Sequence, residues 1–172
     1  MIKGSLFITT LLLGGCAKGA NGLDAIHADI VGDYPGVSHV ADIPANAILL
    51  DIREPSEFSV SRLPGAIQVS PDADIAQLVA GLGDISGRPV IAYCSVGRRS
   101  SGFAQRAQDQ LSVAGAISVS NLENGIFGWH NARGALVNGE GETDVVHPYN
   151  ELWKRYVVRQ SKARYTPESV QP

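Results

Sequence analysis

The sequence lacks several features that whole classes of protein require. Its 172 residues include only two cysteines, Cys16 and Cys94, so a framework of paired disulfides is excluded. A net charge of −3 argues against a protein that binds nucleic acid by neutralising phosphates. The 4 histidines have no ligand-like spacing with Cys94 or with one another, so we expect no metal site, and no cofactor is implied. With 44% hydrophobic residues the chain is too apolar to be disordered, and we expect one globular, monomeric domain.

The first residues lack the length of a membrane span but have the pattern of an export signal. Lys3 precedes a short apolar stretch at residues 6–13, which two glycines and Cys16 follow. A membrane-spanning helix needs roughly 20 apolar residues, whereas a positive start, a short apolar region and small residues are typical of a signal peptide. The ending resembles a bacterial lipoprotein lipobox, in which the cysteine becomes the acylated first residue of the mature protein. The alternative is a buried apolar strand or helix.

The lipobox resemblance implies a signal peptide at residues 1–15 and a protein whose partner is the lipid bilayer, through Cys16. Ala17 stands where an aspartate typically marks retention in the inner membrane. We therefore expect a place in the bacterial cell envelope, at the outer membrane and facing the periplasm. Residues 16–36 are weakly patterned, so we expect them to be the lipid anchor and a spacer. The domain itself is expected over residues 37–138, with a C-terminal extension over residues 139–172.

Charge is unevenly distributed between the expected domain and its extension. Ten acidic residues and two arginines lie between residues 24 and 84, whereas residues 153–164 carry five basic residues and no acidic one. We expect the extension to contain a basic helix, which either packs on the acidic domain or contacts anionic lipid headgroups beside the anchor. Residues 147–150 and Trp153 form an amphipathic segment to which the sequence assigns no chemical role.

Short apolar runs alternate with segments of helical pattern along the domain. The runs are consistent with strands buried on both faces, and the spacing of Ile75, Leu78 and Val79 is that of an amphipathic helix. This alternation is typical of a parallel sheet with helices on both faces. We expect strands near residues 47–52, 66–69, 89–93 and 116–119, and helices from residue 55 and over residues 74–80, 103–111 and 124–130.

The strand expected at residues 89–93 leads directly to Cys94. In parallel sheets ligands bind at the carboxyl ends of strands, and the backbone N–H groups of a tight loop that opens a helix bind anions. Gly97 permits such a loop, and Arg98 and Arg99 place positive charge beside the sulfur. Each feature favours the thiolate over the thiol, which suits sulfur transfer or phosphoryl transfer. The alternative, an inert buried cysteine, requires a dry loop, which two adjacent arginines disfavour.

Loop length separates the two chemistries. Cysteine phosphatases use a Cys-x5-Arg loop, which here requires arginine at position 100, but that residue is Ser100. Arg99 comes one residue earlier, so the loop is better matched to a smaller group, such as one extra sulfur atom on Cys94. The spacing therefore favours a sulfurtransferase over a phosphatase. We expect the substrate-binding loop to comprise Ser95, Val96, Gly97, Arg98, Arg99 and Ser100.

Four segments occur in a distinctive order: Asp51–Phe58, Leu63–Ile67, Tyr93–Ser100 and Gly125–Trp129. In their order and spacing they resemble the successive motifs of the rhodanese domain, over about residues 37–137. The resemblance implies an α/β fold with a doubly wound, five-stranded parallel sheet and helices on both faces. It also implies a catalytic Cys94 that cycles through a persulfide, held by a loop that binds the transferred sulfur through backbone N–H groups.

The same resemblance implies a reaction. A rhodanese-type sulfurtransferase moves sulfane sulfur from an anionic donor such as thiosulfate to a thiol acceptor. Asp51 and Arg53, at a strand end, match positions that mainly hold structure near the active loop, so we expect them to support the site rather than to react. A rival from another class is a non-catalytic module of this fold that binds a partner in the envelope, against which the presence of Cys94 counts. A cysteine phosphatase is the less favoured enzyme.

Overall fold

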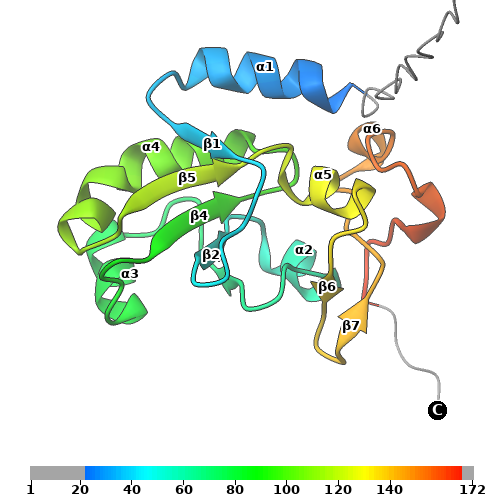
Figure 1. Ribbon diagram of the computed structural model, residues 1–172. Helices are drawn as coiled ribbons and strands as arrows, with labels where there is room; N and C mark the ends of the chain where they lie inside the picture. Colours follow the sequence, from blue (N-terminus) through cyan, green and yellow to red (C-terminus); the bar gives the residue numbers. More distant parts are fainter. Residues whose placement is uncertain (1–21, 168–172) are drawn as a thin grey trace, which may run out of the picture.

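The computed structural model describes residues 22–167, so the expected signal peptide and Cys16 lie outside the described residues. Its main sheet has five parallel strands in the order β1-β5-β4-β2-β3 (Figure 1). This confirms the expected five-stranded parallel sheet of an α/β fold. The strands are β1 (Ser38–Val40), β2 (Ile48–Asp51), β3 (Ile67–Gln68), β4 (Pro89–Tyr93) and β5 (Ser118–Leu122).

The helices begin where local chemistry favours them. In α2, Pro55 occupies the first turn, and Glu54 and Glu57 form a capping box. Asp74 caps α3 by accepting a hydrogen bond from the Gln77 N–H at 2.9 Å. Within residues 22–167 no helix is long and apolar enough to cross a membrane. The helices of the main body are α1 (Leu23–Asp33), α2 (Pro55–Val60), α3 (Ile75–Leu82), α4 (Arg98–Val113) and α5 (Gly125–Asn131).

The sheet separates two apolar cores. Leu50 and Ala92 face one core, whereas their neighbours Leu49 and Ile91 face the other. Side chains of α3 and α4 fill the first core, and those of α5 and the C-terminal segment fill the second. Because successive side chains of a strand point to opposite faces, strands covered on both sides are apolar throughout. This is why the central strands could be recognised as continuous apolar runs.

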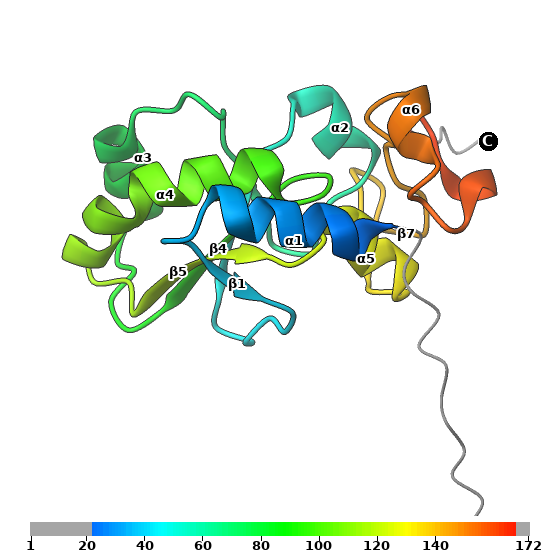
Figure 2. The same cartoon turned by 90° about the horizontal axis from the view of Figure 1, so that it is seen from above.

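Helix α1 corrects the expectation of a spacer over residues 16–36. Residues Leu23–Asp33 form this helix, which runs alongside α4 near the edge strand β1 (Figure 2), and its Leu23 packs in the second core. Leu23 and Ile30 are fully buried, and a Cβ at Gly102 of α4 would lie 3.5 Å from the Tyr34 hydroxyl. These are the only two buried residues among the 11 of α1, so the apolar pattern was too sparse to predict a helix.

The C-terminal extension is mostly irregular, which corrects the expectation of a basic helix. Within residues 139–167 its regular elements are the short strand β7 (Glu142–Thr143), which pairs with β6 (Leu136–Val137) of the domain, α6 (Glu151–Lys154) and a 3-10 turn at Gln160–Lys162. Arg159 and Lys162 pair with Asp144 of the extension itself, at 3.3 and 3.0 Å, rather than with the acidic domain. Val146 and Val157 are buried in the second core, so the extension packs against the domain.

Candidate active site

The register of the sheet brings the chemically active segments to one edge. Asp51 at the end of β2 pairs with Tyr93 at the end of β4, and Asn121 near the end of β5 pairs with Ala92. The carboxyl ends of these neighbouring parallel strands therefore meet where β4 releases the chain into Cys94. Ligands bind at this edge in open α/β sheets, so the topology itself positions the cysteine.

The Cys94 loop, residues 94–100, curls around the sulfur at the start of α4. The Gly97 N–H donates to Cys94 Sγ at 3.2 Å, and α4 begins at the next residue. Gly97 has φ +103°, and a Cβ there would lie 2.8 Å from Asn121 Nδ2, so only glycine fits. The Cys94 thiol is buried, and it faces the positive end of a helix of 16 residues. The Gly97 N–H and the positive end of the helix both stabilise negative charge on the sulfur.

The beginning of α5 holds the loop from the other side. The N–H groups of Ile126 and Phe127 donate to the carbonyl oxygens of Cys94 and Ser95, at 2.9 and 3.1 Å. A Cβ at Gly125 would lie 2.4 Å from the Cys94 carbonyl oxygen, so this close approach requires glycine. Two peptide planes of the loop are thereby fixed by backbone hydrogen bonds alone.

Glu57 is a central residue of the site that sequence reasoning did not single out. This carboxylate of α2 is almost fully buried and accepts hydrogen bonds from both terminal nitrogens of Arg99, at 2.8 and 3.0 Å. The Ser95 hydroxyl also donates to it, at 3.0 Å. Burial alone raises the pKa of Glu57, but the hydrogen bonds and charge of Arg99 outweigh burial and hold the pKa below its usual 4.5. Glu57 is therefore a buried anion that fixes two residues of the loop.

The two arginines of the loop have different surroundings. Arg98 extends to Asp33 of α1, where Nη1 and Oδ2 lie 2.6 Å apart in an exposed ion pair. Arg99 lies against Glu57 and close to the sulfur. Burial lowers the pKa of Arg99, but its hydrogen bonds to Glu57 and the charge of Cys94 outweigh burial and raise it. Arg99 is thus the cation beside the sulfur, whereas the Arg98 guanidinium is shared with α1.

Asp51 and Arg53 form a fully buried ion pair beneath the loop. Arg53 donates to the Asp51 carboxylate at 2.6 and 2.9 Å. Its remaining donors reach the backbone carbonyls of Ser61, at 2.7 Å, and Glu57, at 3.4 Å. The pair therefore connects the end of β2 to α2, the helix that carries Glu57.

The remaining loop residues face the interior. Ser100 is fully buried, and its hydroxyl lies 2.5 Å from Asn121 Oδ1 and 3.2 Å from the Gly97 carbonyl oxygen. Val96 packs in the second apolar core. Position 100 thus connects the loop to β5.

The C-terminal extension also reaches the site. The Arg99 guanidinium carbon lies 5.1 Å from the centre of the Tyr149 ring. His147 is buried nearby, and its pKa is lowered mainly by burial, with the cations Arg53 and Arg99 adding to the effect and Glu57 opposing it. The amphipathic pattern of residues 147–150 marked this segment without revealing its partner.

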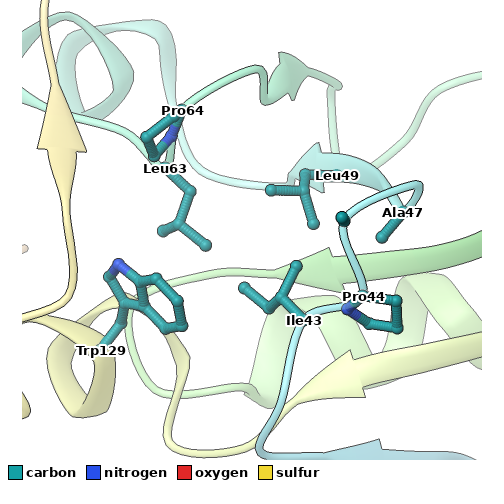
Figure 3. Close-up of a pocket in the computed structure, with 8 residues that line it drawn as sticks. Ile43, Pro44, Ala47, Leu49, Leu63, Pro64 and Trp129 are labelled. Atoms are coloured by element: carbon teal, nitrogen blue, oxygen red, sulfur yellow. The ribbon is translucent and has the colours of Figure 1, made fainter.

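A separate pocket carries no reactive group. It lies between the β1–β2 connection and α5 and is lined by apolar side chains, among them Ile43, Leu63 and Trp129 (Figure 3). Trp129 uses its indole N–H to bond the Ala135 carbonyl oxygen at 2.9 Å. Among residues 22–167 no three His, Cys, Asp or Glu side chains group as metal ligands. The Cys94 loop is therefore the candidate active site.

Comparisons with known proteins point to one family. The model of the rhodanese-like domain matches residues 39–132. The thiosulfate sulfurtransferase of Pseudomonas aeruginosa has a TM-score of 0.51 and 22% identity, over 83% of this chain and 27% of that one. A rhodanese from E. coli, solved with anions, has a TM-score of 0.40 and 22% identity, over 54% and 99%. A Rhodopseudomonas palustris protein of unknown function, a possible tyrosine phosphatase, has a TM-score of 0.43 and 20% identity, over 76% and 98%. At these identities the likeness is one of fold.

The buried carboxylate makes stability depend on pH. The pKa of Glu57 is lower in the folded protein than in the unfolded chain, so ionised Glu57 contributes to the free energy of unfolding. This contribution is fully present above the pKa that Glu57 has in the unfolded chain. It is lost as pH falls through the pKa that Glu57 has in the folded protein. We expect Glu57→Gln to lower the free energy of unfolding by about 2–3 kcal/mol at about pH 7, and the deficit to shrink towards about pH 3. Urea unfolding at both pH values measures this.

The matched control is Glu140→Gln, at an exposed position, which should change stability by less than about 0.5 kcal/mol at either pH. A Glu57→Gln deficit that stayed constant or grew at acid pH would contradict the assignment of Glu57 as a stabilising anion.

Proposed function

Since the chain belongs to the rhodanese-like domain family, we propose that it is a sulfurtransferase in which Cys94 carries sulfane sulfur from a small anionic donor to a thiol acceptor. The observation that carries this proposal is the position of the sulfur. Cys94 Sγ accepts the Gly97 N–H at the start of α4, and Arg99 provides a fixed cation beside it. This environment holds anions and stabilises the negative charge of a nucleophilic sulfur.

The first half of the reaction loads the cysteine. The Cys94 thiolate attacks the outer sulfur of a donor such as thiosulfate, and a new sulfur–sulfur bond forms on Cys94. The sulfur–sulfur bond of thiosulfate breaks, and its electron pair leaves with sulfite. The backbone N–H groups at the start of α4 and the Arg99 guanidinium stabilise the charge on the persulfide.

The second half returns the cysteine to its starting state. An acceptor thiolate attacks the outer sulfur of the persulfide, and the bond to Cys94 Sγ breaks with its electron pair staying on Sγ. The acceptor becomes a persulfide and Cys94 is again a thiolate. No oxidant or reductant is consumed, so the cycle requires no redox cofactor.

The size of the loop supports sulfur over phosphate as the transferred group. Arg99 completes the loop one residue earlier than the arginine of a Cys-x5-Arg phosphatase, and it is held by Glu57. Ser100, at the position of the phosphatase arginine, is directed into the interior against Asn121. The six residues from Cys94 to Arg99 enclose a space that fits a single sulfur atom better than a phosphoryl group.

Mass spectrometry of the intact protein tests the loading step. After incubation with thiosulfate, we expect the wild type to gain the mass of one sulfur atom and Cys94→Ser to gain none. Cys16→Ser, the matched control at the other cysteine, should gain sulfur like the wild type. Turnover with a thiol acceptor should fall at least about 10³-fold in Cys94→Ser, because the nucleophile is lost.

A wild type that gains no sulfur from thiosulfate and shows no Cys94-dependent turnover would contradict a sulfurtransferase. It would instead favour a binding module of this fold. Hydrolysis of a phosphate monoester that Cys94→Ser abolishes would favour the phosphatase.

We also propose that a lipid on Cys16 anchors the protein in the bacterial envelope, facing the periplasm and at the outer membrane. The lipobox pattern supports this proposal. Because α1 begins at Leu23, residues 17–22 alone separate Cys16 from the folded domain, and six residues span at most about 22 Å when extended. An anchor with two or more acyl chains does not readily dissociate, so the active site would work close to the bilayer.

Detergent partitioning of the protein from cells tests the anchor. The wild type and Cys94→Ser should enter the detergent phase with residues 1–15 removed and acyl mass added. Cys16→Ser should carry no acyl mass and keep residues 1–15. A wild type that stays in the aqueous phase and retains these residues would overturn the proposal.

A further inference from the structure

A residue outside the family match completes the surroundings of Arg99. The rhodanese-like model ends at residue 132, yet Tyr149 places its ring 5.1 Å from the Arg99 guanidinium carbon. Two edges of this guanidinium are already occupied, because its nitrogens donate to Glu57 and Ser95. Its central carbon lies over the Tyr149 ring. A cation over an aromatic face is attracted by the electrons of the ring.

The turn that carries Tyr149 is held in an uncommon conformation. Tyr149 has φ +65°, in the left-handed region that residues other than glycine rarely adopt. Its N–H donates to His147 Nδ1 at 3.1 Å, and the Asn150 N–H donates to the Pro148 carbonyl oxygen at 2.8 Å. A left-handed backbone conformation at a residue other than glycine is strained, and it persists where neighbouring contacts hold it, often at functional sites.

Two other residues of the extension, Tyr165 and Glu151, support this turn. The His147 ring packs edge-on against Tyr165, with centroids 5.3 Å apart. Tyr165 in turn donates its hydroxyl to Glu151 at 2.6 Å. Tyr149 is 46% exposed, so it lies at the surface beside Arg99 rather than within the core. The extension therefore presents one aromatic ring to the outer side of the active-site cation.

We propose that Tyr149 is a positioning residue for the reaction proposed above: its ring keeps the Arg99 guanidinium on the Cys94 loop and so determines how tightly the loop holds a small sulfur anion. Without the ring, only Glu57 and Ser95 hold Arg99, and water reaches the side of the guanidinium that the ring covers, where it hydrates and screens the charge. The donor then loses part of the attraction that brings it to Cys94. The nucleophile and the backbone N–H groups at the start of α4 are unchanged.

Persulfide formation at varied thiosulfate concentration tests this inference, with quenched samples weighed to give the loaded fraction of Cys94. Tyr149→Gly removes the ring but suits the left-handed turn, so the fold is retained. Tyr149→Phe keeps the ring. Leu152→Ala, at a side chain of the extension that is 71% exposed, is the surface control.

We expect Tyr149→Gly to raise the half-saturating thiosulfate concentration about two- to fivefold, the range that a cation–π contact at a partly exposed site supports. The limiting rate should change less than about twofold, because Tyr149 does not touch the sulfur. Tyr149→Phe and Leu152→Ala should behave like the wild type.

A Tyr149→Gly variant that saturates like the wild type would overturn the inference and leave the sulfurtransferase in place. Tyr149→Phe as impaired as Tyr149→Gly would also overturn it, because the ring would not be the working group. A wild type that takes no sulfur from thiosulfate would reject the sulfurtransferase and the role of Tyr149 together.

Discussion

The active site depends on the neutralisation of one buried carboxylate. A buried anion is costly unless it is paired and hydrogen-bonded, and Glu57 meets this need with Arg99, the Ser95 hydroxyl and the Glu54 N–H. Two of these partners belong to the Cys94 loop and the third to the capping box of α2. Satisfying Glu57 therefore holds the loop against α2 and orients the cation that lies beside the sulfur. Arg53 reinforces this arrangement by donating a hydrogen bond to the backbone carbonyl oxygen of Glu57.

The parallel sheet supplies the rest of the geometry. It places the end of β4 between β2 and β5, so Cys94 emerges with a helix beginning behind it and α5 beside it. The N-terminal N–H groups of α5 bond two loop carbonyls, and the close approach at Gly125 permits this. Backbone hydrogen bonds from α5 and the buried Glu57 carboxylate thus hold the loop in place. The Cys94 sulfur remains at the positive, N-terminal end of α4. A preorganised anion site of this kind needs little rearrangement when charge moves onto the transferred sulfur.

Continuous apolar runs could be predicted, and contacts between distant segments could not. Residues 89–93 were predicted as a strand and form β4, because burial on both faces makes every position apolar. Strand β1 and helix α1 escaped prediction, since β1 has three residues and α1 buries only two. The partnership of Glu57 with Arg99 joins positions 42 residues apart, and that of Tyr149 crosses from a separate segment. Both pairings arise from tertiary structure, which periodicity does not report.

A crystal structure of the wild-type protein after exposure to thiosulfate tests the central claim most directly. We expect one added sulfur atom bonded to Cys94 Sγ inside the loop, with the Arg99–Glu57 pair intact at hydrogen-bond distance. An unmodified Cys94, or a persulfide seen only when Arg99 has left Glu57, would contradict it.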